Sequence, residues 1–301
     1  MKVIVLFILG CCILITSCTE EETFVNFSYP DGKYKSLIMS YDDGVVDDIR
    51  LISLFDKNDI IGTFNLNSGY LGMTRGWPME NGDTIFQSYL PKDSLIIVYK
   101  NHEIAAHGAL HKNLTDITED EVLEEIETDI LKLKQITGRE IISMAYPFGN
   151  TNENVARILQ ATGITNARTV GDTYTFELPE NYFIWNPTCH DSKANDYIKD
   201  YIDLNEHSLS VFYVWGHSWE FKDQKRWNNI VRFCEQIGNQ DDIWYVGSGQ
   251  YIDYLKALDN IIISEQEIIN PIGNDLVWVE LSTGFKILEP GDKLKIKSKN
   301  Y

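Results

Sequence analysis

Residues 35–44 read KSLIMSYDDG, an apolar run that ends in two adjacent carboxylates, Asp42 and Asp43. A continuous apolar run of this length is typical of a buried strand. Two like charges at its end repel each other, and burying them costs free energy unless a cation or a proton compensates. We therefore look to the other strand ends of the chain for the groups that compensate these two acids.

Predicted strands and helices alternate along the chain after this run. The clearest helix covers 119–136, because Thr118 and Glu121 form a capping box and Gly138 follows the last turn. Such alternation favours a parallel sheet with helices outside, and about seven units over residues 36–258 favour an α/β barrel. Short strand-like runs then predict a small β appendage over 259–301. The predicted barrel strands lie at 36–41, 61–66, 103–107, 141–146, 164–170, 208–217 and 243–247.

The composition narrows the classes of partner. The formal net charge is −19, so nucleic acid phosphates and anionic lipid headgroups would be repelled, and we expect no nucleic acid partner. Cys189 and Cys234 lie far apart in the sequence, and we predict no disulfide between them. Nothing in the sequence indicates an oligomeric state.

The N-terminus has the features of an export signal. Lys2 precedes an apolar run at 3–15, which is too short to span a bilayer comfortably. The run leads into Ile-Thr-Ser-Cys at 15–18, which resembles a bacterial lipobox. We therefore expect a lipoprotein signal peptide at 1–17, a lipid on Cys18 and a tether at 18–35. We expect the protein to contact the membrane through this anchor only. It would be located in the cell envelope, at the outer membrane, in the periplasm or exposed on the surface.

Unusual polar side chains sit at the carboxyl ends of several predicted strands, where barrel folds gather functional groups. Asp42 and Asp43 end one strand, His107 another and His217 a third. The segment HGALH places His107 and His111 four residues apart, close enough to share a cation. Two His and one Asp leave coordination positions open, which is the pattern of a catalytic zinc site. The second Asp would remain free as a base.

Four ordered motifs over residues 36–217 resemble those of the polysaccharide deacetylases, carbohydrate esterase family four. They are SYDDG, HGALH, AYPFG at 145–149 and VFYVWGH at 211–217. AYPFG is most similar to the branch that includes poly-N-acetylglucosamine deacetylases. The resemblance implies a distorted (β/α)-barrel of about seven strands.

The resemblance also implies a role for each motif residue. The metal, most often Zn²⁺, would be held by Asp43, His107 and His111. Asp42 would be the general base, His217 the general acid, and the Tyr146 N–H would help to hold the oxyanion. Sugar contacts are expected from Tyr146 and Pro147 and from stacking on tryptophans, namely Trp219, Trp185 and Trp77.

The sequence departs from the family pattern at two places. Many members carry an Arg that orients the base two residues before the motif Pro, and this chain has Ala145 there. Many also carry an Asp that tunes the catalytic His, for which Asp191 is the candidate here. These departures leave the groups that set the protonation of His217 undefined.

We expect a metal-dependent hydrolase that removes acetyl groups from N-acetylated sugars of a polysaccharide or oligosaccharide. An O-acetyl esterase acting on acetylated glycans would need the same site. A glycan-binding lipoprotein on a degenerate barrel is a further alternative, although a binder would have no need of Asp42 or His217.

Overall fold

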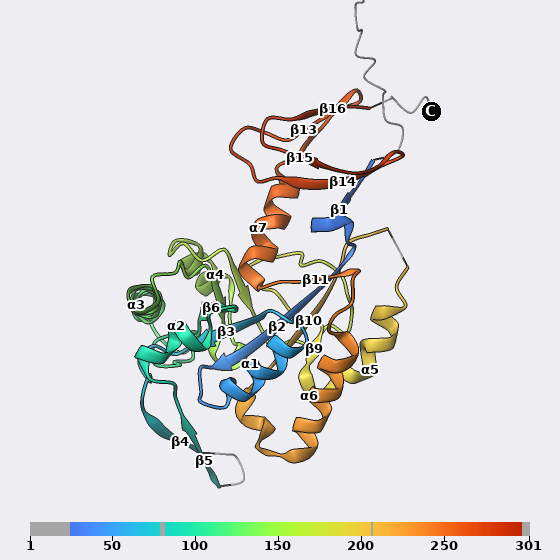
Figure 1. Cartoon of the computed structure of the whole chain (residues 1–301). Helices are drawn as coiled ribbons and strands as arrows, with labels where there is room; N and C mark the ends of the chain where they lie inside the picture. The colour runs from blue at the N-terminus through green and yellow to red at the C-terminus, as the bar shows by residue number, and fades with distance from the viewer. Residues whose placement is uncertain (1–24, 79–81, 206, 297–301) are drawn as a thin grey trace, which may run out of the picture.

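The computed structural model describes residues 25–78, 82–205 and 207–296. Its main sheet contains eight parallel strands, in the order β8-β7-β6-β3-β2-β10-β9, with β11 paired to β2 (Figure 1). The predicted α/β barrel with a C-terminal β appendage is confirmed. The strands are β2 (Lys35–Asp43), β3 (Gly62–Leu66), β6 (Glu103–Ala106), β7 (Ser143–Ala145), β8 (Asn166–Arg168), β9 (Cys189–His190), β10 (Ser210–Gly216) and β11 (Ile243–Tyr245).

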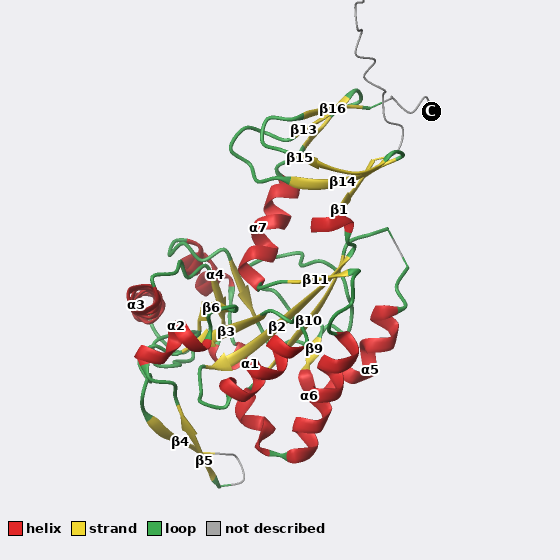
Figure 2. Cartoon of the chain, in the orientation of Figure 1, coloured by secondary structure: helices red, strands yellow, loops and turns green. Residues whose placement is uncertain are grey.

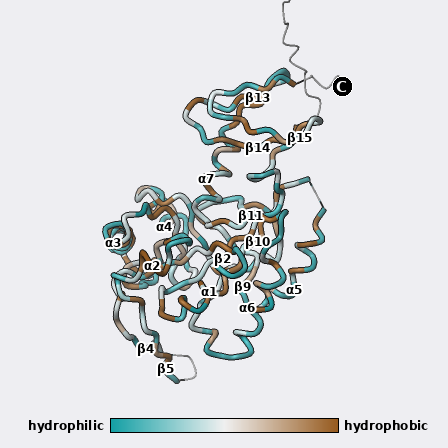
Figure 3. Tube along the Cα trace, viewed as in Figure 1, coloured by the Kyte–Doolittle hydropathy of each residue, from teal (hydrophilic) through white to brown (hydrophobic). Residues whose placement is uncertain are grey.

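Strand β2 lies at the centre of this sheet. All its residues are buried, as expected for a strand covered on both faces. It pairs with β10 along residues 35–41, with β3 along 39–43, and with β11 along 35–37. Hydrophobic residues follow β2 and β10 through the middle of the molecule (Figure 3). The stretch that ends in Asp42 and Asp43 is therefore the strand against which the rest of the barrel is assembled.

Helices surround the sheet (Figure 2). The longest, α3, begins with the predicted capping box of Thr118 and Glu121 and ends at Gly138, which has a left-handed φ of 68°. Among the described residues, no helix is both long enough and apolar enough to cross a bilayer. The helices are α1 (Asp48–Lys57), α2 (Leu95–Val98), α3 (Glu119–Thr137), α4 (Glu153–Gln160), α5 (Asp191–Ile202), α6 (Gln224–Ile237) and α7 (Ser248–Asp259).

The segment that precedes β9 bridges the gap between β8 and β9. The Trp185 N–H donates to the Ala167 carbonyl at 3.0 Å, and the Thr169 N–H donates to the Trp185 carbonyl at 3.0 Å. The indole of Trp185 is 2% exposed and stacks on Tyr251, with ring centroids 5.5 Å apart. Trp185 thus packs in the core and does not line the candidate site described below, so the structure gives no support to the predicted substrate contact.

The C-terminal appendage consists of two small antiparallel sheets at one end of the molecule (Figure 1). One of its strands comes from the N-terminal region, because β1 (Val25–Ser28) pairs with β14. The expected tether at 18–35 is thus too long, since its second half is folded. The signal peptide and Cys18 lie outside the described residues. The other strands are β12 (Ile262–Ile263), β13 (Glu267–Ile269), β14 (Val277–Leu281), β15 (Gly284–Leu288) and β16 (Lys293–Lys295).

A β-hairpin projects from the barrel at the end opposite the appendage (Figure 1). Its strands are β4 (Thr74–Pro78) and β5 (Thr84–Ser88), which pair antiparallel. The sequence indicated only a Gly-rich excursion here, because the two short strands are half exposed and show no strong apolar alternation. This hairpin forms one wall of the site described below.

Replacing Trp185 should test its structural role. We expect Trp185→Ala to lower the free energy of unfolding by about 3–5 kcal/mol, because it leaves a cavity between Tyr213 and Tyr251. Denaturant unfolding monitored by circular dichroism would measure this loss of stability. Phe86→Ala, at an aromatic that is 66% exposed, serves as the control and should change stability by roughly 0.5 kcal/mol or less. Equal losses in the two variants would contradict the assignment.

Candidate active site

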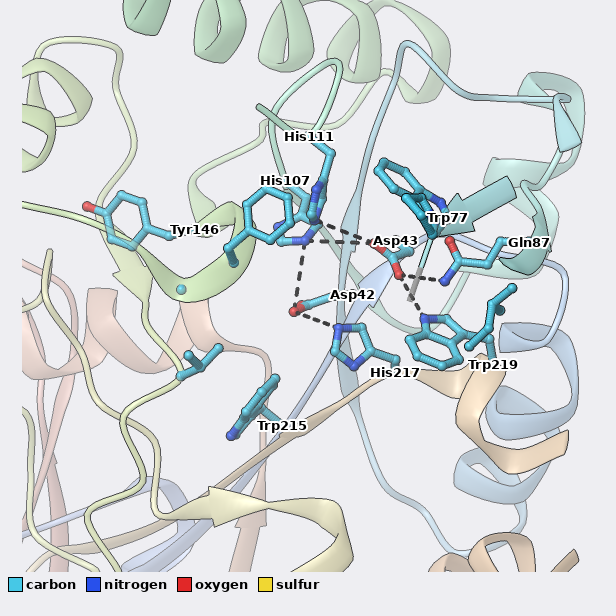
Figure 4. Close-up of a pocket in the computed structure, with 15 residues that line it drawn as sticks. Asp42, Asp43, Trp77, Gln87, His107, His111, Tyr146, Trp215, His217 and Trp219 are labelled. Atoms are coloured by element: carbon cyan, nitrogen blue, oxygen red, sulfur yellow. Dashed lines mark hydrogen bonds and ion pairs between the residues drawn. The ribbon is translucent and has the colours of Figure 1, made fainter. Parts of the chain in front are cut away.

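A cavity of about 320 Å³ opens where β2, β6, β7 and β10 end, on the side of the barrel that faces the hairpin. It brings together eight of the residues singled out from the sequence, six of which come from the four motifs (Figure 4). The hairpin contributes a further wall. The cavity is lined by Asp42, Asp43, Trp77, Pro78, Ile85, Gln87, His107, His111, Tyr146, Phe148, Gly149, Val170, Trp215, His217 and Trp219.

The backbone at Asp43 explains how two consecutive acids reach one cavity. Successive side chains of a regular strand point to opposite faces. Asp43 has a φ of 85° and Gly44 a φ of 72°, so the chain leaves the strand conformation there. A Cβ on residue 44 would lie 2.5 Å from the Leu66 side chain, so only glycine fits this turn. Both carboxylates consequently enter the cavity from the end of β2.

Asp43, His107 and His111 form a group with the donor atoms of a metal site. The Asp43 Oδ1 lies 3.9 Å from the Nε2 atoms of both His107 and His111. Two metal–ligand bonds of about 2.0–2.1 Å can span such a gap, so the three residues fit a divalent cation. The His107 Nδ1 lies 2.8 Å from the Ala145 carbonyl, which turns Nε2 toward Asp43. Burial, followed by the neighbouring His107, lowers the pKa of His111 to about 4, so it is a neutral donor.

The second oxygen of Asp43 is held by two side chains that the sequence did not connect to it. Trp219 Nε1 donates to Oδ2 at 2.9 Å, and Gln87 Nε2 donates to it at 3.4 Å. Gln87 belongs to hairpin strand β5. These bonds leave Oδ1 directed at the two histidines, which favours coordination through a single oxygen. Trp219, expected to stack on sugar, lines the cavity but also orients Asp43.

Asp42 is paired with an arginine that the sequence analysis missed. Arg168 Nη2 donates to both carboxylate oxygens, at 2.5 and 2.6 Å, and Asn65 Nδ2 donates to Oδ1 at 2.9 Å. Burial would raise the pKa of Asp42, but Arg168 and then His107 and His217 outweigh it and lower the pKa to about 2. Asp42 is therefore ionised, and its Oδ2 faces His107 at 3.9 Å and His217 at 4.0 Å.

His217 reaches Asp42 from the side opposite His107 (Figure 4). Its Nδ1 lies 3.1 Å from Glu220 Oε1, one turn further along the chain. Burial would lower the pKa of His217, but the hydrogen bond that its Nδ1–H donates to Glu220 and the charges of Asp43 and Asp42 raise it to about 9. The imidazole is thus kept protonated at neutral pH.

Asp191, the residue expected to tune His217, has other partners. It accepts from Arg226 Nη2 at 2.6 Å and from the Tyr41 hydroxyl at 3.2 Å. Arg226 also forms an ion pair with Glu220. Asp191 therefore reaches His217 only indirectly, through Arg226 or His190 and then Glu220, and the direct partner of His217 is Glu220.

Tyr146 and Pro147 do not take the positions that the resemblance implied. The Tyr146 N–H donates to the Arg168 carbonyl at 3.0 Å, so it is not available to an oxyanion, and its hydroxyl points away to Phe183 (Figure 4). Pro147 is buried and does not line the cavity. In the same turn, the N–H of Phe148 has no acceptor among the described residues. Phe148 lines the cavity, and its ring contacts His111 at 4.5 Å between centroids.

Different signals could have revealed the missed residues. Arg168 is a charged residue within the predicted strand 164–170, and it is 1% exposed. A buried Arg requires an anionic partner, but the sequence does not show which of the buried acids it meets. Glu220 lies three residues after His217, a spacing at which side chains meet when the chain turns helically, as η4 (Ser218–Lys222) does.

Comparisons with known proteins give a family match and solved structures of similar fold. Residues 21–167 match the family model described as polysaccharide deacetylase. A search among curated proteins found no match. A crystal structure from Mycobacterium smegmatis, provisionally described as a polysaccharide deacetylase, is similar with a TM-score of 0.55 at 17% identity, covering 80% of this chain and 96% of that one.

Two further structures resemble the chain less closely. The chitin deacetylase of the fungal pathogen Colletotrichum lindemuthianum has a TM-score of 0.49 at 13% identity, covering 72% of this chain and 87% of that one. A family 4 carbohydrate esterase from Streptomyces lividans in complex with acetate has a TM-score of 0.42 at 13% identity, covering 68% and 85%. Residues 21–167 thus resemble the polysaccharide deacetylase family, and the chain shares the fold of the mycobacterial protein.

Proposed function

We propose that the protein is a metal-dependent hydrolase that removes acetyl groups from N-acetylated sugars of a polysaccharide or oligosaccharide. The observation that carries this proposal is the joint placement of an ionised Asp42 and a protonated His217 beside a group able to hold a divalent cation. Zn²⁺ is the ion that suits two imidazoles and one carboxylate. Such an ion would supply Lewis acidity to the acetyl carbonyl and to the attacking water.

Asp42 would act as the general base. Arg168 donates to both of its oxygens and Asn65 to Oδ1, while Oδ2 also faces His107 and His217 across the cavity and would accept a proton from water there. The ion pair with Arg168 keeps the carboxylate ionised and fixes its direction. This arrangement supplies the orienting group that Ala145 cannot provide.

His217 would act as the general acid. An amide releases its amine poorly unless the departing nitrogen is protonated, and His217 carries the proton on the other side of Asp42 from the histidine pair. Oxyanion stabilisation would come from the Phe148 N–H rather than from Tyr146, because the Tyr146 N–H is paired with Arg168 whereas the described part of the chain offers the Phe148 N–H no acceptor. The acid favours an N-acetyl substrate, since an ester needs less help with its leaving group.

We also propose that the protein is lipid-anchored in the cell envelope through Cys18. The described chain begins at β1, in the appendage, whereas the hairpin that walls the site lies at the opposite end of the molecule (Figure 1). An anchor on the N-terminal side of β1 would leave the site directed away from the membrane. A Cys18→Ser variant should move from the membrane to the soluble fraction, and unchanged membrane retention would contradict the anchor.

Acetate release from a panel of glycans tests the reaction. We expect the protein to release acetate from N-acetylglucosamine oligomers, to lose activity with a chelator and to regain it with Zn²⁺. Asp42→Ala should lose turnover by about 10²–10⁴-fold and keep its metal, whereas His107→Ala should lose both. Metal content would be measured on the purified variants.

The same panel separates the alternatives. Release from acetylated xylan without release from N-acetylglucosamine oligomers would identify an O-acetyl esterase. Glycan retention that survives Asp42→Ala, with no acetate released by the wild type, would identify a binding protein and contradict the hydrolase.

The pH dependence of the reaction tests the partner of His217. Glu220 raises the pKa of His217, and the acid is active only below that pKa, so activity should fall as pH rises through it. Glu220→Gln removes the negative charge and should move the alkaline limb of the kcat/KM profile to lower pH. Glu265→Gln, at an exposed position on the appendage, is the control. An alkaline limb that stays in place in Glu220→Gln would show that Glu220 does not set the pKa of His217.

A further inference from the structure

His111 has a backbone conformation that is uncommon for a residue with a side chain. Its φ is 52°, in the left-handed region, at the end of the turn that also carries His107. A histidine held in this region must be kept there by its surroundings. The conformation matters because it decides where the imidazole of a candidate metal ligand points.

The ring of His111 lacks the hydrogen bond that fixes the ring of His107. The His107 Nδ1 is held by the Ala145 carbonyl at 2.8 Å, whereas the His111 Nδ1 is buried and has no partner among the described residues. Ring contacts with Phe148 and Trp77 restrict His111, but they do not select its direction as a hydrogen bond does. The backbone therefore has to supply the orientation of this ligand.

One carboxylate oxygen holds the backbone on both sides of His111. Glu125 Oε1 accepts from the Leu110 N–H at 2.6 Å and from the Lys112 N–H at 3.3 Å. Glu125 projects from α3 and is 4% exposed. Bringing the N–H groups of residues 110 and 112 to the same oxygen curls the chain around His111, which accounts for its left-handed conformation.

Side chains other than Glu125 bind the backbone of the first part of the turn. The role of Glu125 is therefore separate from theirs. Asp129, one turn further along α3, accepts from the His107 N–H at 2.9 Å and from the Ser68 N–H at 2.8 Å. Asn67 Nδ2 donates to the His107 and Gly108 carbonyls, both at 2.7 Å. These bonds fix the first part of the turn, whereas the N–H groups that flank His111 both meet Glu125.

We propose that Glu125 is a positioning residue for the metal: its Oε1, by accepting both N–H groups that flank His111, holds the Nε2 of that ligand toward Asp43. The inference rests on the proposed metal site of Asp43, His107 and His111. Gly108, with a φ of 76°, leaves room for the carboxylate, since a Cβ there would lie 3.1 Å from Oε1. The position of the oxygen is what matters, and its charge is secondary.

Two conservative substitutions of Glu125 separate the effect of the position of its oxygen from the effect of its negative charge. Glu125→Gln keeps an oxygen at the same distance from the backbone without the charge. Glu125→Asp keeps the charge but withdraws the oxygens by roughly 1.5 Å, so neither can reach both N–H groups. We expect Glu125→Gln to bind Zn²⁺ as tightly as the wild type, and Glu125→Asp to bind about 10- to 100-fold more weakly. Competition with a chromogenic chelator at fixed pH would measure the affinity.

The absorption spectrum of the Co²⁺ form provides a readout independent of activity. Loss of His111 from the coordination sphere should change this spectrum in Glu125→Asp and leave it unchanged in Glu125→Gln. Glu125→Met keeps the side-chain length but has no acceptor, so it should resemble Glu125→Asp. Glu124→Asp, at the exposed neighbour on α3, is the matched control. Thermal unfolding of each metal-free variant would show that it is folded.

A double-mutant cycle with His111→Ala decides whether Glu125 acts through this ligand. We expect Glu125→Asp to cost no further Zn²⁺ affinity when His111 is already absent. An equal loss in both backgrounds would overturn the inference, as would wild-type affinity in folded Glu125→Asp or Glu125→Met, or a loss in Glu125→Gln. If wild type binds Zn²⁺ no more tightly than His111→Ala, the proposed metal site itself has failed.

Discussion

Two carboxylates that follow each other in the chain, Asp42 and Asp43, lie buried at the end of β2, 3% and 7% exposed. Neighbouring buried anions destabilise a fold unless each meets its own compensating group. Asp42 meets Arg168 through both of its oxygens, whereas Asp43 turns away through its left-handed backbone toward His107 and His111. The strand ends and the hairpin carry the side chains that meet the two acids separately.

The charges of the two acids are compensated in different ways, and this difference supports the separate roles proposed for them. Asp42 is neutralised by a guanidinium within the protein, so it can remain an anion without any ligand. Trp219 and Gln87 give Asp43 neutral N–H groups, which orient the carboxylate without cancelling its charge. The nearby His111 is neutral as well, so a bound cation would compensate the charge of Asp43. The proposed base and the proposed metal ligand thus differ in how their charges are compensated.

The sequence predicted those parts of the molecule that depend on local pattern. The barrel strands, α3 with its caps, and the meeting of Asp42, Asp43 and His217 follow from apolar runs and from the shared edge at which parallel strands end. It did not predict Trp185 in the core or the pairing of the Tyr146 N–H, because both depend on contacts between segments distant in sequence. Periodicity shows that a residue is buried, but it does not show what covers it.

The arginine that orients the base illustrates why such contacts escape a motif. The motif resemblance placed this Arg at the position of Ala145, and in the sheet Ala145 pairs in register with Arg168 on the neighbouring strand β8. A guanidinium on a long side chain can reach the same carboxylate from either strand, since the anion requires a donor pair at a given point in space. In this chain the guanidinium that pairs with Asp42 therefore comes from the neighbouring strand. A sequence motif specifies a residue type at one position of the chain. It therefore misses the same interaction when the side chain comes from a neighbouring strand.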